Sequence, residues 1–425
     1  MAGSTLAEKL LARAAGVPRA AAGEHHWCRV DMALLTDPTA PQVAAALEQA
    51  GAERVFDASR VAVFHDHFVP AKDARAAELA RASRRFALDQ DLEHFYEVGR
   101  AGVCHVALPE LGLVLPGDLV LGADSHTTTH GALGAFATGM GATDMAAALA
   151  LGETWLRVPE TVRVELHGRP DSRLVGGKDV ALALLGRIGV RGAIYQALEF
   201  GGDGVSALSL ADRFTISNMS VEAGAKVGLF EADDVALEWL RGRSERAPQG
   251  VVLHADADAG YTSRMSLDLS TLEPLVAEPH SPANVRPASE LGDVDVDQVL
   301  LGSCTNGRIE DFRLALEVLG DCPVHPRVKL IVLPGSPGVL LAMIAEGLAE
   351  RLVEAGAVIG PCTCGPCIGA PPGVLAGDEV ALFTTNRNFP GRSGALGSRV
   401  YLAGPAVAAA TAVRGKITDP REVLA

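Results

Sequence analysis

Seven cysteines occur in this 425-residue chain, and four of them stand where thiolates could bind a metal. Cys362, Cys364 and Cys367 fall within six residues, and the last two form a Cys-Gly-Pro-Cys pair. Such a pair is typical of zinc sites, of thioredoxin-like dithiols and of iron–sulfur ligands. The glycines and prolines of 369–373 disfavour the helix that a thioredoxin-like motif opens. A structural zinc site usually needs a second pair, which the sequence lacks.

Cys304, in GSCTNGR, adds a third thiolate from a distant loop of similar glycine-rich and polar character. Three cysteines suit an iron–sulfur cluster that leaves one iron without a protein ligand and open to substrate. Spacing alone leaves Cys362 available as a fourth ligand. Cys28, Cys104 and Cys322 stand alone, and we expect them to be ordinary packing residues.

Polar side chains also gather where two apolar segments end. Residues 61–70 read as a buried strand that runs into a loop, with Asp66 and His67 at its exit, where side chains tend to face a crevice. Residues 124–130, DSHTTTH, follow a second apolar segment. Such a run is ordinarily a surface turn, but the glycines after it allow the close approach that a buried site requires. Asp124 beside His126 would suit a polarised imidazole.

Glu222 lies among small residues in 216–234, where we expect a polar turn followed by a helix. A glutamate there is either a solvated helix residue or a buried carboxylate with a partner, and its neighbours in sequence do not decide between the two. Two glycine-rich segments, 176–179 and 201–205, complete neither a Walker loop nor GxGxxG, so we expect no nucleotide site.

The elements that must position these groups alternate between strands and helices. We expect helices at 41–51 and 178–190, a strand at 162–168, and an α/β unit over 294–425 with Cys304 at a strand's exit. The pattern of residue types along the sequence changes near residue 157, and a proline-rich stretch follows at 275–293. We therefore predict three α/β/α segments, which span 1–157, 158–282 and 283–425.

Composition excludes several classes of protein. The formal net charge is −15, from 52 acidic and 37 basic residues, which argues against a nucleic-acid surface and an anionic membrane. No apolar run approaches the length of a membrane span, and the first residues read as an amphipathic helix, not a signal peptide. An odd cysteine count without a signal peptide disfavours a disulfide framework. We expect a cytoplasmic protein.

Four motifs, GADSHTTTHGA, GSCTNGRIED, CGPCIG and TTNRNFPGR, resemble the aconitase superfamily. Within it, the chain is most similar to the large subunits of the 3-isopropylmalate dehydratase and homoaconitase type. This resemblance implies three α/β/α domains around a central 4Fe-4S cluster, one per subunit. It also implies that Cys304, Cys364 and Cys367 hold the cluster, that one iron lacks a protein ligand, and that Cys362 is a bystander.

The resemblance further implies a hydro-lyase that moves a hydroxyl between adjacent carbons of a 2-hydroxy di- or tricarboxylate. Conversion of 2-isopropylmalate to 3-isopropylmalate, in leucine biosynthesis, is the first expectation, and homoaconitate or another substituted malate is the alternative. The catalytic residues it implies are Asp66, His67, His105, Asp124, His126 and Glu222. The substrate-binding residues are Ser125, Arg387, Arg392 and Arg308, and the neighbours of the cluster are Asn218, Asn306 and Asn386. We expect ordinary packing or surface roles for His65, His94 and His130.

Two features depart from the single-chain aconitases. Pro41 stands where those enzymes carry a glutamine that contacts substrate. The chain also ends soon after the third segment, without the swivel domain that supplies a serine base and a further arginine in the family. We therefore expect a small, swivel-domain subunit as partner. An iron-sensing RNA-binding relative is the competing class, and the acidic charge and lack of a basic stripe disfavour it.

Overall fold

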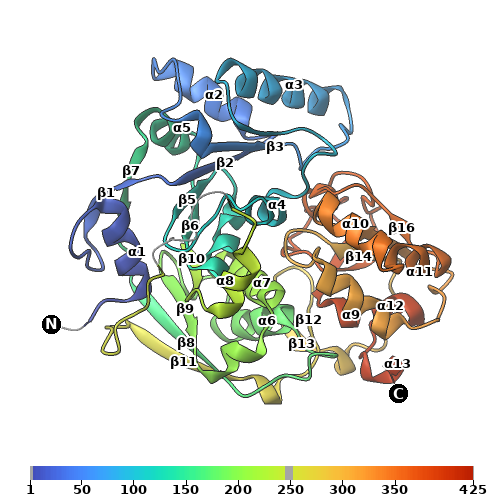
Figure 1. The fold of residues 1–425 in the computed structure, drawn as a ribbon. Coiled ribbons are helices and arrows are strands. Elements are labelled where there is room, and N and C mark those ends of the chain that lie inside the picture. Colours follow the sequence, from blue (N-terminus) through green and yellow to red (C-terminus); the bar gives the residue numbers. More distant parts are fainter. Residues whose placement is uncertain (1–2, 245–251, 425) are drawn as a thin grey trace.

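The computed structural model describes residues 3–244 and 252–424, along which strands and helices alternate. The strands form sheets of five, four and seven strands and one two-stranded ribbon. The predicted α/β class is confirmed, and parallel pairs dominate the sheets because helices connect most successive strands. The sheets lie around a centre that contains α4 (Cys104–Glu110) and α7 (Leu210–Met219) (Figure 1).

The first sheet has five parallel strands in the order β4-β3-β2-β5-β6. Three of them are buried throughout, as expected of a parallel sheet covered on both faces. The strands are β2 (Met32–Thr36), β3 (Val61–Phe64), β4 (His94–Tyr96), β5 (Leu119–Gly122) and β6 (Phe136–Gly139). The helices of this part are α1 (Leu6–Ala15), α2 (Ala40–Gln49), α3 (Ala74–Asp89) and α5 (Ala142–Leu151). Figure 1 shows α2, α3 and α5 on the outer face and α4 toward the centre.

The second sheet has four parallel strands in the order β10-β9-β8-β11. Its strands are β8 (Thr161–His167), β9 (Ala197–Gly201), β10 (Val227–Phe230) and β11 (Ser263–Asp268). Its helices are α6 (Gly177–Ile188), α7 and α8 (Asp234–Leu240). The expected strand at 162–168 and helix at 178–190 are therefore confirmed.

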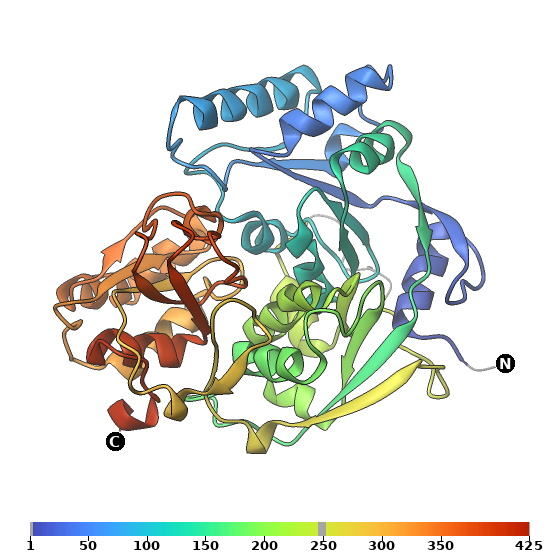
Figure 2. The ribbon, with the colours of Figure 1, turned by 180° about the vertical axis from the view of Figure 1, so that it is seen from behind.

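The third sheet has seven strands in the order β13-β12-β18-β17-β14-β15-β16, and only the pairs that β12 makes are antiparallel. Its strands are β12 (Leu275–Ala277), β13 (Val285–Pro287), β14 (Gln298–Gly302), β15 (Lys329–Leu333), β16 (Val358–Ile359), β17 (Val380–Phe383) and β18 (Arg399–Ala403). Its helices are α9 (Ile309–Leu319), α10 (Pro337–Ala345), α11 (Leu348–Glu354), α12 (Pro405–Arg414) and α13 (Arg421–Leu424). Because β12 belongs to this sheet, the sheet extends across the boundary that we placed before residue 283. Figure 2 shows this part from behind.

Short 3-10 helices join these elements. They are η1 (Ala58–Arg60), η2 (Ser125–Leu133), η3 (Asp203–Ala207), η4 (Ser220–Ala223), η5 (Leu269–Thr271), η6 (Ala288–Glu290) and η7 (Gly365–Ile368). The polar run at 124–130 is not a surface turn, because nearly all of η2 is buried and packs against α7 and β10.

Two local expectations were wrong. Residues 216–219 end α7 instead of forming a polar turn, and a strand, β10, follows η4 where we expected a helix. Within the unit expected over 294–425, the apolar pattern of residues 338–356 predicts one long helix. The structure breaks it into α10 and α11 at Gly347, whose φ of 73° is in the left-handed region that glycine favours.

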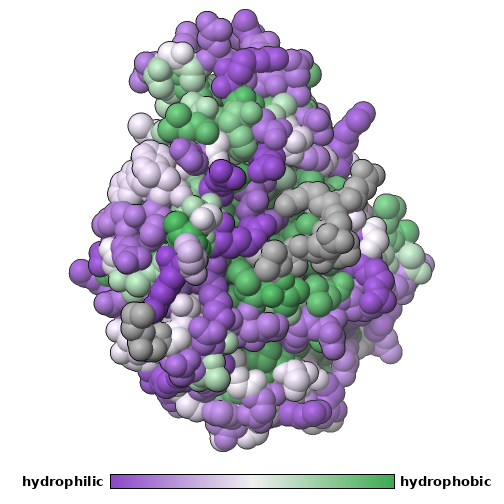
Figure 3. Space-filling model, turned by 60° about the vertical axis from the view of Figure 1, so that its left-hand side comes forward, coloured by the Kyte–Doolittle hydropathy of each residue, from purple (hydrophilic) through white to green (hydrophobic). Residues whose placement is uncertain are grey.

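An antiparallel ribbon of β1 (His25–Arg29) and β7 (Glu153–Arg157) runs along one side of the molecule, where exposed Trp27 lies opposite exposed Trp155. Figure 3 shows this side, which is largely hydrophilic with a hydrophobic area near the middle of the view. Among the residues that the structure describes, no helix is long and apolar enough to cross a membrane.

Candidate active site

Loops at the carboxyl ends of β3, β5, β14 and β17 converge on one pocket, together with η7 and the start of α4. This edge of a parallel sheet is where side chains of α/β proteins commonly meet a ligand. The space that atoms leave unfilled in and around the mouth of the pocket is about 350 Å³, which includes space open to solvent. Its lining consists of His67, Val103, His105, Asp124, Ser125, His126, Cys304, Cys364, Cys367, Ile368, Asn386, Arg387 and Arg392.

The three predicted cluster cysteines lie together and buried in this pocket. The amides of Asn218 and Asn386 donate to Cys304 Sγ over 3.2 and 3.3 Å, and Cys367 Sγ lies 3.3 Å from Asn386 Oδ1. Amide donors of this kind stabilise thiolate sulfur. Asn218 and Asn386, which the resemblance implies as neighbours of the cluster, thus both lie beside Cys304.

The charge of these thiols favours a bound cation. Burial raises the pKa of Cys304 to about 12, and the nearby Cys367 thiolate adds to the shift. A hydrogen bond between Cys364 and Cys367 holds the pKa of Cys367 below its ordinary value and that of Cys364 well above it. Three thiolates can therefore coexist here only with positive charge between them, and three cysteines with amide donors fit an iron–sulfur cluster. Cys362 is half-buried and does not line the pocket.

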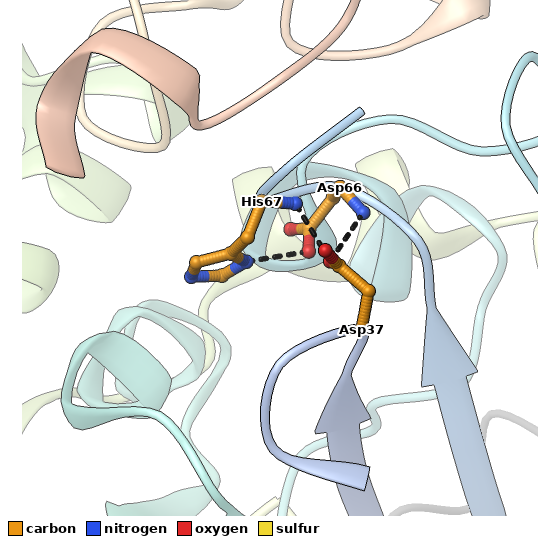
Figure 4. A group of neighbouring side chains, drawn as sticks. All are labelled: Asp37, Asp66 and His67. Carbon is orange, nitrogen blue, oxygen red and sulfur yellow. Dashed lines mark hydrogen bonds and ion pairs between the residues drawn. The ribbon is translucent and has the colours of Figure 1, made fainter. Parts of the chain in front are cut away.

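Asp66 and His67 form a buried pair at the exit of β3 (Figure 4). His67 Nδ1 lies 2.6 Å from Asp66 Oδ1, and His67 Nε2 lies 3.5 Å from Asp124 Oδ2. Burial opposes the charged form of the imidazole, but the two carboxylates outweigh it and hold the His67 pKa well above its ordinary value. His67 is therefore a proton-carrying imidazolium near neutral pH.

Asp37 fixes the loop that presents this pair, and sequence reasoning missed it. Its carboxylate accepts the backbone N–H groups of Asp66, His67 and Phe68 at 3.1, 2.8 and 2.9 Å (Figure 4). The ligand atoms of Asp37, Asp66 and His67 lie within 4.8 Å of one another, but three donors already occupy Asp37, so it serves as an anchor. The only signal in the sequence is an aspartate directly before Pro38, which is typical of a turn.

Asp124 is shared by three imidazoles. His105 Nε2 lies 2.8 Å from Asp124 Oδ1, and His126 donates its backbone N–H to the same oxygen at 2.8 Å. Burial alone would raise the Asp124 pKa, but hydrogen bonds from His105, His126 and His67 hold it well below its ordinary value. The carboxylate of Asp124 therefore favours the protonated forms of His67 and His126, whose pKa values are both raised.

Glu222 is the buried carboxylate with partners, not a solvated helix residue. Its carboxylate lies 2.9 Å from His126 Nε2 and 2.8 Å from Arg387 Nε, and Arg387 Nη2 donates to Ser125 Oγ over 3.1 Å. These partners overcome the effect of burial and keep the Glu222 pKa below its ordinary value. The chain Ser125, Arg387, Glu222 and His126 thus links the loops of all three sheets.

Of the three remaining predicted residues, one lines the pocket and two do not. Arg392 lines the pocket, and its Nε is buried without a hydrogen-bond partner, which leaves a donor for an anion. Arg308 and Asn306 do not line it. The Arg308 guanidinium donates to the carbonyls of Cys304 and Thr305, and the Asn306 amide donates to Asp311 Oδ1 at 2.8 Å. Both residues therefore brace the Cys304 loop from behind.

The histidines and cysteines without an expected site role are mostly structural. His65 is buried and bonded to Glu97 and Ser83, and His94 lies on β4. His130 is buried 3.5 Å from His105, and burial holds its pKa well below the ordinary value. Cys28 and Cys104 are buried, whereas Cys322 is exposed.

Comparisons with known proteins agree with this geometry. The sequence profile described as "Aconitase family (aconitate hydratase)" matches residues 8–292 and 284–415. A protein of Moorella thermoacetica named "3-isopropylmalate dehydratase large subunit" is 51% identical over 99% of this chain and 100% of its own length. A protein of Pyrococcus furiosus named "3-isopropylmalate dehydratase large subunit 1" is 49% identical over 100% of both chains.

A solved structure shares the fold at low sequence similarity. The aconitase X of Thermococcus kodakaraensis, in its holo form, superposes with a TM-score of 0.53 at 13% identity over 88% of each chain. The profile match over most of the sequence, with relatives about half identical over the full chain, confirms the resemblance seen in the motifs. The chain belongs to the aconitase family.

Proposed function

We propose that this chain is the cluster-bearing large subunit of a hydro-lyase that isomerises 2-isopropylmalate to 3-isopropylmalate by dehydration and rehydration. One observation carries the proposal: three cysteines, His67 with Asp124, and two arginines line the same pocket. The names of relatives about half identical over the full chain support this substrate.

Cys304, Cys364 and Cys367 would hold a 4Fe-4S cluster, one per subunit, with one iron left without a protein ligand. When bound, such a group supplies a Lewis acid that weakens the bond to a departing hydroxyl. Asn218 and Asn386 would donate to the thiolates that hold it. Support comes from the buried thiols on one wall of the pocket.

His67 would protonate the departing hydroxyl and take the proton back in the reverse direction. An acid with a pKa above neutrality keeps its proton until the leaving group needs it. Asp66 fixes the ring through Nδ1 at 2.6 Å and leaves Nε2 as the atom that faces Asp124 and the pocket. Asp124 and Glu222 would hold His105, His126 and Arg387 in place around the substrate.

Arg392 and Arg387 would bind the substrate carboxylates. A guanidinium suits a planar carboxylate because it offers paired N–H donors. Arg392 Nε has no partner in the protein, whereas Arg387 is partly engaged by Glu222 and Ser125. We therefore assign the stronger carboxylate contact to Arg392.

The second proton, at the carbon beside the carboxylate, would be removed by a serine of a small, swivel-domain partner subunit. The relatives that support this assignment are themselves named as large subunits. The chain's acidic charge would leave carboxylate binding to the arginines inside the pocket.

The test is anaerobic reconstitution of the chain with iron and sulfide, alone and with a candidate small subunit. We expect about four irons per chain, a brown chromophore, and dehydration of 2-isopropylmalate only when the small subunit is present. Homocitrate and homoaconitate are measured side by side. If homocitrate or homoaconitate is turned over faster than 2-isopropylmalate, the faster compound is the substrate. Full activity without a partner would disprove the two-subunit arrangement.

The ligand assignment is tested by serine substitutions. Cys304→Ser, Cys364→Ser and Cys367→Ser should each lose the chromophore, whereas Cys362→Ser, the neighbouring control, should retain it. A protein that binds a single zinc and stays colourless would rule out the cluster.

A further inference from the structure

Lys178 is a fully buried lysine, with 0% of its surface exposed, in the first turn of α6. Its ammonium donates to the carbonyl oxygens of Thr384 at 2.9 Å and Thr385 at 2.5 Å, and lies 3.6 Å from Met219 Sδ. These two carbonyls stand directly before Asn386 and Arg387 in the pocket wall. Lys178 thus contacts the back of the segment whose front faces the cysteines.

No carboxylate forms an ion pair with this ammonium in the part of the chain that the structure describes. Among residues 3–244 and 252–424, no Asp or Glu oxygen lies within 4.0 Å of Lys178 Nζ. The adjacent Asp179 is turned away, and its carboxylate accepts the backbone N–H groups of Gly176 and Leu275, both at 2.9 Å. A buried ammonium without a counter-charge is strongly unfavourable. The burial of the Lys178 ammonium therefore requires a physical explanation.

Arg308 repeats the pattern at the loop that carries Cys304. Its Nη1 donates to the carbonyls of Cys304 and Thr305 at 3.3 and 3.1 Å, and its guanidinium lies 4.5 Å from the Phe214 ring centre. Within the described part of the chain, no carboxylate forms a side-chain ion pair with it, and its Nη2 has no hydrogen-bond partner. One buried cation therefore contacts the loop that carries Cys304, and the other contacts the segment that leads into Asn386.

The negative groups that act on these cations include the thiolates themselves. Burial disfavours the charged form of both cations and lowers the pKa of Lys178 to about 8. Against this, Cys304 and Cys367, followed by Asp311 and Asp179, favour charged Lys178. Asp311, followed by Cys304, favours charged Arg308. We infer that Lys178 and Arg308 form a buried pair of cations behind the cysteines. The positive charge of this pair offsets the negative charge of a thiolate-held cluster. This inference rests on the proposed cluster, and both cations act through charge and position without touching substrate.

A charge beneath a redox-active group shifts its reduction potential, because a nearby cation favours the more negative, reduced state. Lys178→Gln keeps N–H donors for the two carbonyls but removes the charge. In the reconstituted chain at a fixed applied potential, we expect about a tenfold lower ratio of reduced to oxidised cluster, or about 59 mV for one electron. Arg308→Gln should shift the potential in the same direction.

Two controls separate charge from hydrogen bonding. Lys178→Arg keeps the positive charge and should keep a potential close to wild type. Thr305→Val removes a neutral hydrogen bond of 2.7 Å to the same Thr384 carbonyl and should also leave the potential unchanged. Spectroelectrochemical titration followed by cluster absorbance measures all five proteins.

A second readout compares urea unfolding of the loaded and the cluster-free protein. If the pair of cations offsets the charge of the cluster, Lys178→Gln should lower the free energy of unfolding of the loaded form more than that of the cluster-free form. A purely structural contact should give equal losses in the two forms. A wild-type reduction potential in both Lys178→Gln and Arg308→Gln would overturn the inference. If Lys178→Gln does not fold, the reduction potential of Arg308→Gln alone tests the inference. Failure of the wild-type chain to take up any cluster would instead refute the proposed cofactor, and this inference with it.

Discussion

His67 lies between two carboxylates, and its charge should set the alkaline limit of activity. Asp66→Asn keeps the side-chain shape but removes the nearer charge, so the His67 pKa should fall toward its ordinary value. We expect the alkaline limb of kcat/KM to move to lower pH by about one unit. Glu97→Gln, which alters the analogous contact to His65 outside the pocket, is the matched control. An unmoved limb would show that another group is the acid.

The same pair links stability to pH. Because folding raises the His67 pKa, its contribution is complete below the ordinary histidine pKa of the unfolded chain. That contribution is lost as pH rises through the raised, folded value. Asp66→Asn should therefore cost most stability in acid and progressively less in mild alkali, which urea unfolding across this range would measure.

Asp37 offers a second test at the scale of one residue. Asp37→Asn retains one acceptor oxygen for three buried N–H groups, so at least one donor loses its partner. We expect a loss of about 1–3 kcal/mol in unfolding free energy and reduced kcat, because the Asp66–His67 loop loses its anchor. Asp73→Asn, which alters an exposed helix cap, should cost almost nothing because Asn caps as well as Asp.

The residues that could do chemistry were recognisable from the sequence, but the buried residues that hold their loops in place were not. Cys304, His105 and Glu222 stand in motifs. Cys304 and His105 line one pocket, and Glu222 bonds to His126 in the lining of that pocket. Asp37 and Lys178 give no such signal, since a turn aspartate and a lysine after glycines are ordinary on a surface. Only the tertiary structure shows that both are buried.

At the scale of elements, α4 must approach the third sheet closely to aim His105. A Cβ on Gly102, just before α4, would lie 2.0 Å from the Gly335 carbonyl oxygen. Gly102→Ala should therefore displace the helix, with a loss of about 1–3 kcal/mol in stability and a fall in kcat. Gly141→Ala is the control, because a Cβ there meets nothing within 4 Å. Thermal unfolding and steady-state kinetics measure both variants, and equal effects would disprove the steric account.

Elements with a plain periodic pattern could be predicted, and those held by tertiary contacts could not. Strands β14, β15 and β17 and helices α9 and α12 follow the apolar patterns expected over 294–425. Helix α7 ends in Thr215, Ser217 and Asn218, which favour turns on their own. It forms because it packs along η2, another polar segment that reads as a turn. Each supplies the environment that the other needs.

At the scale of the whole molecule, the three sheets share hydrophobic cores. Leu35 and Val63 of the first sheet pack in one buried cluster with Val227 and Leu229 of the second. A further cluster joins Val164 of the second sheet to Leu300 and Phe383 of the third. We therefore expect the segments that we separated by sequence to unfold together.

Scanning calorimetry of the cluster-free chain should show one transition, with equal calorimetric and van't Hoff enthalpies. Loading the cluster should raise the midpoint without adding a transition, because ligand that binds only the folded state stabilises all of it. Separate transitions in the cluster-free chain would mean that the shared cores do not couple the sheets.

Asp124, the carboxylate common to His67, His105 and His126, has a consequence for how mutant data combine. Groups that share one counter-charge titrate as a unit, so each apparent pKa in a pH profile belongs to the set and not to one imidazole. Asp124→Asn should disturb all three rings at once. In a double-mutant cycle with Asp66→Asn, the losses in log kcat/KM should fall clearly short of additivity, because the second substitution acts on a histidine already released by the first.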